Sequence, residues 1–283
     1  MLIIKNTLDY LNIYQAQLEN KKIGFVPTMG FLHEGHLSLV KESVKNNQIT
    51  IVSIFINPTQ FVKGEDFATY PKNTEHDLKL LEANNVDIVF IPEAEDLYPP
   101  DHKSLIKIEI NQNFTNKLCG KHRRGHFGGV ALIVMKLFSI IQADNAYFGL
   151  KDYQQYVLIK NLSLDFFPRT KIHALPTIRE SSGLAMSSRN TYLNDKEKKL
   201  ASLIYATLLK FTEIIKISKT INQEELIKAF EALLLKESTA FELQYLEIYD
   251  DTLNKIKKYK KNQTFIGTAV YLNNVRLIDN LIF

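Results

Sequence analysis

The sequence is poor in cysteine, which restricts the kinds of site that it can build. Cys119 is the only cysteine among 283 residues. An intrachain disulfide is therefore impossible, and thiolates cannot supply the ligands of a zinc site. Because disulfides belong mainly to proteins of oxidising compartments, this composition predicts a cytoplasmic protein.

Long apolar runs are also missing. The N-terminal apolar run ends at Lys5, and the longest apolar stretch, Val130–Ile141, is interrupted by Lys136. The first is too short for the core of a signal peptide. The second has the length of a buried helix rather than of a bilayer span. We therefore expect neither export nor a membrane segment.

The charge shows no strong bias. Lysine and arginine number 35 against 31 aspartates and glutamates, the net charge is +4, and 45% of the residues are hydrophobic. This composition is typical of a folded globular protein and argues against disorder. A mildly basic chain suits anionic small molecules such as nucleotides. It lacks the strong positive charge of a dedicated nucleic-acid binder.

The hydrophobic pattern predicts two domains, which the length also favours at roughly 150 residues per domain. Between residues 22 and 175, short runs rich in β-branched residues alternate with helical patterns, as in a parallel sheet covered by helices on both faces. The expected strands are Lys22–Val26, Ile49–Phe55, Val86–Ile91, Ala146–Phe148 and Lys171–Leu175. We predict an α/β fold in which residues 1–176 form a doubly wound, Rossmann-like parallel sheet domain that binds the ligands.

A different pattern follows residue 176. Asn194 and Glu197 have the spacing of a capping box at the start of a long helix, and a second helix is expected at Gln223–Leu235. The expected strands are Phe241–Tyr249, Thr264–Leu272 and Val275–Ile278, with Asn273 and Asn274 as the turn between the last two. Residues 177–283 are therefore predicted to form a smaller α+β domain, which is a natural lid.

Polar loops follow three of the expected parallel strands. They are Pro27–Gly30, Asn57–Gln60 and Gly149–Asp152. In doubly wound sheets, ligands bind outside the carboxyl ends of the strands, where loops lead into helix N-termini. We therefore expect the three loops to meet at one edge of the sheet and to form a ligand site there.

Two histidines lie in the sequence His33-Glu34-Gly35-His36, between an expected strand and the helical pattern that begins at Leu37. Both imidazoles should thus lie at a helix N-terminus, which favours anions. They can donate hydrogen bonds to phosphate, and glycine allows close approach of a nucleotide. A pair of histidines is weak evidence on its own, because many such pairs have no functional role.

A second element that suits phosphate is Met186-Ser187-Ser188-Arg189, in a loop that contains Gly183. Hydroxyls and the arginine fork bind phosphate well, although a Ser-Ser-Arg sequence alone is common in loops. In combination, H-x-G-H and Ser-Ser-Arg in a doubly wound sheet match two signatures of the adenylyl-transferring superfamily that includes class I aminoacyl-tRNA synthetases. The combination is far more specific than either part.

A closer resemblance covers nearly the whole chain. The motifs that carry it are Pro27-Thr28-Met29-Gly30, His33-x-Gly35-His36, Asn57-Pro58-x-Gln60-Phe61, Arg123-x-Gly125-His126-Phe127, Lys151-Asp152-x-Gln154-Gln155 and Gly183-Leu184-Ala185-Met186-Ser187-Ser188-Arg189-Asn190. In this order they resemble the pantothenate synthetase family. The sequence departs from the family pattern at Lys72, Arg124 and Leu150. Lysine at 72 cannot reproduce the fork of the arginine that is usual there.

The resemblance implies an ATP-dependent ligase that condenses (R)-pantoate with β-alanine through a pantoyl-adenylate, releasing AMP and pyrophosphate. It implies ATP as a substrate, Mg²⁺ as a cofactor, a homodimer and a cytoplasmic location, with no nucleic-acid or membrane partner. The residues implied to surround ATP are Met29, Gly30, Phe31, Leu32, His33, Glu34, Gly35, His36, Gly149, Leu150, Lys151, Asp152, Ile178, Met186, Ser187, Ser188 and Arg189. Gln60, Gln155 and Asn57 would bind pantoate. His36, His33, Lys151 and Arg189 would be catalytic, with His36 as the acid. No residue is assigned as a metal ligand.

Three alternatives have some support in the sequence. His33, His36, His122 and His126 could form a zinc site of a hydrolase, but their spacing does not match a helical zinc motif. The basic run Lys255–Lys261 could contact RNA, but such runs are usually solvated loops. A different nucleotidyltransferase of the same superfamily is the nearest alternative, and the two glutamine-containing loops argue against it.

Overall fold

The computed structural model describes residues 1–99, 107–218 and 220–283. The chain forms two compact units, and each unit is assembled from three separate stretches of the sequence. Unit 1 contains Met1–Ile110, Arg123–Leu150 and Gln155–Pro176, and unit 2 contains Asn111–His122, Lys151–Gln154 and Thr177–Phe283. Pro176 therefore ends the last segment of unit 1. The division of roles between residues 1–176 and 177–283 stays a prediction.

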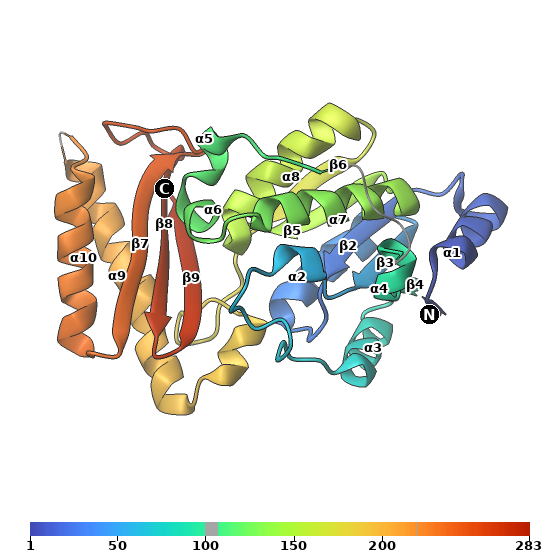
Figure 1. Cartoon of the computed structure of the whole chain (residues 1–283), viewed down its shortest axis with the longest axis horizontal. Coiled ribbons are helices and arrows are strands. Elements are labelled where there is room, and N and C mark those ends of the chain that lie inside the picture. Colours follow the sequence, from blue (N-terminus) through green and yellow to red (C-terminus); the bar gives the residue numbers. More distant parts are fainter. Residues whose placement is uncertain (100–106, 219) are drawn as a thin grey trace. The chain divides into compact units, whose positions relative to one another are not determined.

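Unit 1 is built on a parallel sheet (Figure 1). Its described strands are β1 (Leu2–Ile4), β2 (Ile23–Thr28), β3 (Ile49–Ile54), β4 (Ile88–Phe90), β5 (Asn145–Gly149) and β6 (Lys171–Leu175). They lie in the order β1-β4-β3-β2-β5-β6, and all pairs are parallel. The sheet continues from β2 to β3 on one side and from β5 to β6 on the other. Doubly wound sheets bind their ligands at such a switch point, which here lies between the neighbouring strands β2 and β5.

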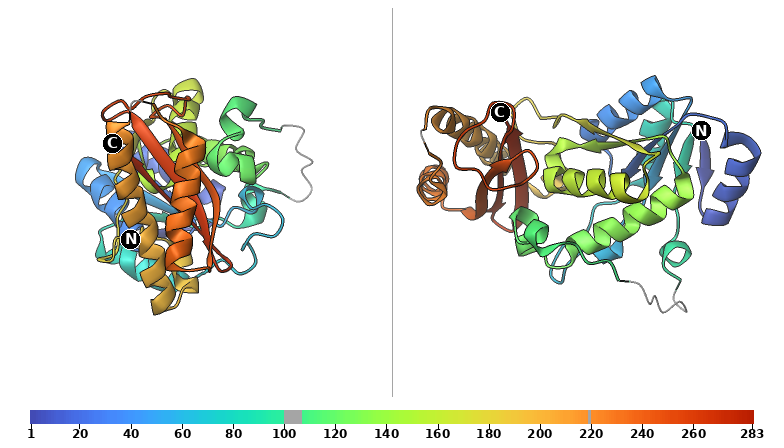
Figure 2. Two further views of the ribbon diagram at one scale, coloured as in Figure 1. Left: turned by 90° about the vertical axis from the view of Figure 1, so that its left-hand side faces the viewer. Right: turned by 90° about the horizontal axis from the view of Figure 1, so that it is seen from above.

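Helices cover both faces of this sheet, as seen from above in Figure 2. The helical segments of unit 1 are α1 (Thr7–Ile13), η1 (Tyr14–Leu18), α2 (Glu34–Asn46), η2 (Pro58–Gln60), α3 (Thr74–Ala83), α4 (Ala94–Leu97), α7 (His126–Ile141) and most of α8 (Tyr153–Phe166). On one face, Val26 and Val52 pack with Val40 of α2 and Leu81 of α3. On the other, the ring of Phe138 from α7 lies 6.4 Å from that of Phe25. The doubly wound α/β prediction is confirmed.

The strand predictions for unit 1 are confirmed to within a few residues, but one strand was missed. β1 pairs with β4 through Leu2↔Ile88 and Ile4↔Phe90. A three-residue apolar run carries no recognisable period, so only its tertiary pairing makes it a strand. The apolar stretch that ends at Ile141 forms the buried helix α7, as predicted.

Unit 2 has an antiparallel sheet with strands β7 (Phe241–Asp250), β8 (Thr264–Leu272) and β9 (Val275–Ile282). Its helical segments are α5 (Gln112–Thr115), α6 (Leu118–His122), η4 (Ser188–Tyr192), α9 (Asp195–Ile217) and α10 (Gln223–Glu237), with η3 (Leu150–Asp152) at the boundary between the units. Helices α9 and α10 cover one face of the sheet, where Phe211 and Phe230 pack with Ile266 and Val270 (Figure 2). The predicted α+β unit is confirmed.

The local signals in the C-terminal part of the sequence are also confirmed. Asn194 caps α9, and Glu197 completes the capping box. The turn between β8 and β9 is two residues long, because Leu272 pairs with Val275, and Asn273 adopts a φ of 52°. Asparagine tolerates this left-handed conformation better than most residues, which is why the turn was visible in the sequence.

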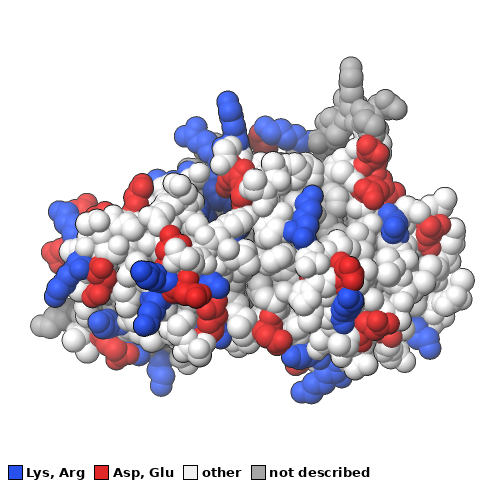
Figure 3. All heavy atoms as spheres, turned by 90° about the horizontal axis from the view of Figure 1, so that it is seen from below, with Lys and Arg blue, Asp and Glu red and all other residues white. Residues whose placement is uncertain are grey.

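Surface charge and helix hydropathy bear on the possible partners. Over the face drawn in Figure 3, lysine and arginine side chains alternate with aspartate and glutamate. No helix within residues 1–99, 107–218 and 220–283 has both the length and the apolar character needed to cross a bilayer.

Candidate functional site

The two histidines of the H-x-G-H sequence lie at the N-terminus of α2, as predicted. His33 is the N-cap rather than a helical residue, and His36 lies in the first turn. Their ring centroids are 4.1 Å apart. The two rings therefore lie next to each other at the N-terminal end of the helix.

Hydrogen bonds define the tautomer of both rings. The backbone N–H of Gly35 donates to His33 Nδ1 at 3.1 Å, and the N–H of His33 donates to His36 Nδ1 at 3.4 Å. A nitrogen that accepts an N–H bond carries no proton, so each neutral ring holds its proton on Nε2. Both rings are therefore suited to donate from Nε2 to an anion.

A buried aspartate that the sequence analysis did not single out holds the loop before α2. Asp77 of α3 accepts from the backbone N–H groups of Phe31 at 2.8 Å and Leu32 at 2.7 Å, and it is 1% exposed. Gly30 and Phe31 adopt positive φ values of 82° and 52°. The carboxylate therefore fixes an unusual backbone next to the histidines. An acidic residue in a first helical turn is ordinarily explained by the helix dipole, so nothing in the sequence marks Asp77 separately.

The second polar loop contains Asn57 and Gln60 and follows β3. Asn57 Nδ2 donates to Gln60 Oε1 at 3.1 Å, and Gln60 Nε2 lies 2.9 Å from Met29 Sδ. Asn57 is 1% exposed, and its Oδ1 accepts from Tyr98 Oη at 2.9 Å. Burial raises the pKa of Tyr98, so its hydroxyl remains a donor. These contacts connect the loops that follow β2 and β3.

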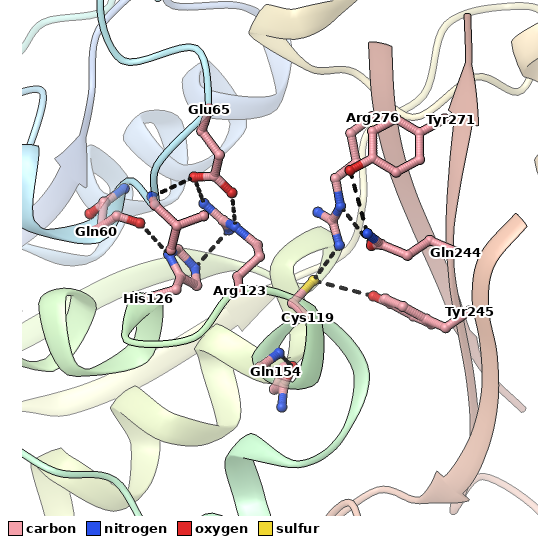
Figure 4. Close-up of polar contacts among 12 residues, drawn as sticks. Gln60, Glu65, Cys119, Arg123, His126, Gln154, Gln244, Tyr245, Tyr271 and Arg276 are labelled. Carbon is pink, nitrogen blue, oxygen red and sulfur yellow. Dashed lines mark hydrogen bonds and ion pairs between the residues drawn. The ribbon is translucent and has the colours of Figure 1, made fainter. Parts of the chain in front are cut away.

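Arg123 and His126 connect the same loop to α7 (Figure 4). Arg123 donates to both carboxylate oxygens of Glu65, at 2.5 and 2.8 Å, and its Nη1 lies 2.9 Å from His126 Nε2. Since a guanidinium can only donate, Nε2 accepts, and the proton of the ring is on Nδ1. That proton is donated to the carbonyl oxygen of Gln60 at 2.7 Å. The motif around Arg123 therefore holds the backbone at Gln60.

Arg123 also determines the protonation state of its partner. Burial alone raises the pKa of the Glu65 carboxyl, but the hydrogen bonds and charge of Arg123 outweigh it, and the pKa lies below its ordinary value. The side chains of Arg123 and Glu65 are 14% and 18% exposed. The pair is therefore ionised and mostly shielded from water.

The loop after β5 contains Gly149, Leu150, Lys151 and Asp152. Lys151 Nζ lies 3.6 Å from Asp152 Oδ2, and the lysine side chain is 19% exposed. Gly149 ends β5, a neighbour of β2 in the sheet, so this strand ends at the same edge as β2 and β3. The expected meeting of three strand ends at one sheet edge is confirmed.

The two adjacent glutamines at the start of α8 differ in environment. Gln154 is 5% exposed, accepts from Gly120 N, and donates to the carbonyl oxygens of Phe114 and Lys117. It holds the segment Asn111–His122 within unit 2. Gln155 is only half-buried and belongs to unit 1. Gln154 is thus occupied by backbone groups of unit 2, and the assignment of Gln155 to a ligand stays a prediction.

Figure 4 also shows the surroundings of the only cysteine. Cys119 Sγ lies 3.2 Å from Tyr245 Oη and accepts from Arg276 Nη2 at 3.4 Å. Arg276 Nε donates to Gln244 Oε1 at 2.9 Å. Burial raises the pKa of Tyr245 well above its ordinary value. These bonds attach α6 to the sheet of unit 2.

The Ser-Ser-Arg segment lies in unit 2. Ser187 caps η4 by accepting from Arg189 N at 3.3 Å, and Ser188 is 6% exposed. Met186 N donates to the carbonyl oxygen of Ile178 at 3.0 Å, which brings these two expected ligand residues together. The segment is a compact hydrogen-bonded loop rather than an extended linker.

The expected ligand residues thus fall into two groups. Those in unit 1 are Met29, Gly30, Phe31, Leu32, His33, Glu34, Gly35, His36, Asn57, Gln60, Gly149, Leu150 and Gln155, and those in unit 2 are Lys151, Asp152, Ile178, Met186, Ser187, Ser188 and Arg189. Within the described parts of the chain, no three or more His, Cys, Asp or Glu side chains form a group that could hold a metal ion. Mg²⁺ is commonly held mainly by substrate phosphates, so it needs no such group.

Comparisons with known proteins agree with the motifs and the fold. A profile of the family described as Pantoate-beta-alanine ligase matches residues 3–282. A pantothenate synthetase from Thermosipho melanesiensis is 45% identical over 273 residues, with 95% of this chain and 94% of that protein covered. One from Thermosipho africanus is 43% identical and is covered over 100% of both chains.

Solved structures give the same result. The pantothenate synthetase of Thermus thermophilus superimposes with a TM-score of 0.90 at 35% identity, covering 100% of this chain and 99% of that one. The pantoate–β-alanine ligase of Francisella tularensis, described as complexed with beta-gamma ATP and beta-alanine, gives a TM-score of 0.81 at 40% identity over 100% and 97% of the two chains. The resemblance inferred from the six motifs is confirmed, and the chain belongs to the pantoate–β-alanine ligase family.

Proposed function

We propose that this protein condenses pantoate with β-alanine in two steps, using ATP. In the first step the pantoate carboxylate attacks the α-phosphorus of ATP, which forms pantoyl-adenylate and expels pyrophosphate. In the second, the amine of β-alanine attacks the acyl carbon, which forms the amide and expels AMP. The match to the ligase family over residues 3–282 is the observation that carries the proposal.

The first step needs donors rather than a base. A carboxylate with a pKa near 4 is already ionised at neutral pH, so no proton has to be removed. Catalysis then depends on alignment and on stabilisation of the charge that grows on the phosphoryl oxygens. We assign this role to the Nε2–H groups of His33 and His36 and to the cations Lys151 and Arg189. On this assignment, His36 acts as a neutral hydrogen-bond donor.

The ligand contacts are assigned by the same chemistry. ATP would contact the loop from Met29 to His36, the loop from Gly149 to Asp152, Ile178 and the segment Met186–Arg189. Pantoate would be bound by the amides of Gln60 and Gln155, which can both donate to its carboxylate and accept from its hydroxyls without adding charge. Asn57 is 1% exposed and its amide already bonds to Gln60, Tyr98 and Gly129, so it would position Gln60 rather than touch pantoate. Mg²⁺ would bind the nucleotide phosphates. The homodimer and the cytoplasmic location rest on family membership alone.

The relative from Francisella tularensis supports the nucleotide and the amine as ligands, because its structure is described as containing beta-gamma ATP and beta-alanine. Donation from neutral histidines at a helix N-terminus also suits phosphate oxygens. By contrast, another adenylyl transferase would have no use for the half-buried amides of Gln60 and Gln155.

Product analysis tests the proposal. The purified protein, given ATP, Mg²⁺ and pantoate, should release pyrophosphate, and added β-alanine should give AMP and pantothenate in equal amounts. A reaction without pantoate is the control and should yield neither product. Formation of ADP, or turnover of ATP that is independent of pantoate, would contradict adenylate chemistry.

A further inference from the structure

Two neighbouring residues of β9, Asp279 and Asn280, contact different segments of unit 2 that are assigned to ATP. Both are largely buried, at 6% and 9% exposed. Successive side chains of a strand point to opposite faces of the sheet. One strand can therefore hold a segment on each face.

Asp279 holds the loop that leads into Ser-Ser-Arg. Its Oδ2 and Oδ1 accept from Nη1 and Nη2 of Arg179 at 2.7 and 2.8 Å. The guanidinium of Arg179 lies 3.6 Å from the ring centre of Tyr205 and also donates to the carbonyl oxygen of Gly183 at 3.1 Å. A bidentate, stacked and mostly buried arginine has little freedom to move.

The loop between Arg179 and Ala185 connects the held arginine to the segment assigned to ATP. Arg179 and Ala185 form an antiparallel bridge, so the two ends of the loop lie side by side, and Met186 follows directly. Asn190 Nδ2 donates to Glu180 Oε1 at 2.9 Å and to the carbonyl oxygen of Ala185 at 3.1 Å, which fixes the other end of the Ser-Ser-Arg segment. Displacement of Arg179 would therefore displace the residues that follow Ala185.

Asn280 holds the other segment. Its Nδ2 donates to the carbonyl oxygen of Lys151 at 2.7 Å. The ammonium of Lys151 can stabilise a phosphoryl group only if its backbone is held at the correct distance, since misplacement by about 1 Å can cost on the order of 10²-fold in rate.

We propose that Asp279 and Asn280 are positioning residues for ATP: through Arg179 and through the Lys151 carbonyl, they fix the two nucleotide-binding segments of unit 2 with a single strand. This inference rests on the proposed function, because that function assigns the two segments to ATP. We assign neither residue a direct contact with a substrate. Their effect should therefore appear in ATP binding and adenylation and not in the reaction of β-alanine.

The test compares Asn280→Ala and Asp279→Asn with wild type. We expect Asn280→Ala to weaken ATP binding, measured calorimetrically without pantoate, by about tenfold, and Asp279→Asn by about ten- to hundredfold. The KM for β-alanine should change less than about threefold. Gln244→Ala is the matched control, because it removes a half-buried amide of the same sheet that bonds to Arg276 and Tyr271 instead. It should leave ATP binding unchanged.

A double variant separates positioning from simple loss of a buried partner. Arg179→Met combined with Asp279→Leu removes both charges and leaves no buried ion unpaired, so the fold should persist. ATP binding should remain weak if the pair positions the loop. Recovery of wild-type ATP binding in the double variant would overturn the proposal for Asp279, and unchanged ATP binding in Asn280→Ala would overturn it for Asn280.

The behaviour of the wild-type protein separates a failure of the positioning proposal from a failure of the proposed function. If wild type binds ATP but forms no pantoate-dependent pyrophosphate, the proposed function fails while the binding comparison still stands. If wild type is fully active and both single variants bind ATP and react as wild type does, the function stands and the positioning role fails.

Discussion

At the scale of single residues, hydrogen bonds to Nδ1 decide what the two histidines can do. His33 and His36 both accept backbone N–H groups through Nδ1, so each presents a neutral Nε2–H. Neutral donors suit a step in which negative charge grows but no proton moves. In the proposed reaction, His33 and His36 would therefore complement the cations Lys151 and Arg189.

Lys151 is the cation whose removal should have the clearest effect. If its ammonium stabilises charge on the α-phosphoryl group, Lys151→Ala removes an interaction that is strongest in the adenylation transition state. Pantoate-dependent exchange of pyrophosphate into ATP, measured without β-alanine, should fall by roughly 10² to 10³. The reaction of supplied pantoyl-adenylate with β-alanine should be affected much less.

A matched variant controls for loss of a lysine in general. Lys79 pairs with Glu75 on α3 at 2.7 Å, and their side chains are 72% and 82% exposed. Lys79→Ala should leave exchange unchanged, because exposed pairs contribute little. If Lys151 only pairs with Asp152, its removal should change exchange by less than about threefold, and that result would rule out the assigned role.

At the scale of elements, the close contact between α7 and the loop after β3 is what places Asn57 and Gln60. A side-chain carbon added at Gly129 would lie 2.1 Å from the carbonyl oxygen of Thr59 and 2.8 Å from Gln60 N. Both neighbours are backbone atoms, which cannot rotate away. Asn57 Nδ2 also donates to the carbonyl oxygen of Gly129 at 3.2 Å. Only glycine allows this approach of helix to loop.

Gly129→Ala should therefore displace the loop that contains Asn57 and Gln60. The expected result is a fall in kcat/KM for pantoate of about ten- to hundredfold, with a smaller change for β-alanine. Steady-state kinetics with each substrate varied in turn would measure it. Ser139→Ala, at an exposed position of the same helix, is the control and should have no effect.

Stability provides a second readout for the same variant. In an unconstrained helix, alanine is more stable than glycine by about 1 kcal/mol. A gain in stability with normal pantoate kinetics would show that the loop adapts without cost, and it would contradict the positioning by Gly129.

At the scale of the whole molecule, the pair of Glu65 and Arg123 makes the stability of unit 1 depend on pH. The pKa of Glu65 is lowered in the folded protein, so the folded state favours the carboxylate. This contribution is fully present above the unfolded pKa of about 4.3 and is lost as the pH falls through the folded-state pKa. The stabilisation thus belongs to neutral and mildly acidic conditions.

Glu65→Gln should lower the free energy of unfolding of unit 1 at neutral pH by about 1 to 3 kcal/mol, because Arg123 loses its charged partner. The difference from wild type should shrink as the pH falls below the unfolded pKa and through the lowered pKa of the folded state, because the wild-type carboxyl then takes up its proton. Urea unfolding at a series of pH values measures both effects. Glu75→Gln removes an exposed partner of Lys79 and should leave stability unchanged. A constant difference across the pH range would contradict the linkage.

The sequence alone determined the periodic and local features of this protein. The strand and helix patterns, the capping box at Asn194 and the turn at Asn273 depend on residues close in the chain, so they were predictable. The six motifs gave the family for the same reason, since each is a short local string. The position of His33 and His36 at a helix N-terminus also followed from local sequence.

Tertiary structure decided the features that join distant segments. The strand at Leu2–Ile4 exists only through its pairing with β4, and Asp77 reaches the loop before α2 from 45 residues away. The role of Gln154 within unit 2, and the contacts of β9 with Arg179 and Lys151, likewise join residues far apart in sequence. Local patterns show which face of a helix or strand is buried, because apolar residues recur there at a regular spacing. They carry no record of which buried polar group meets which partner, because that depends on how the elements pack.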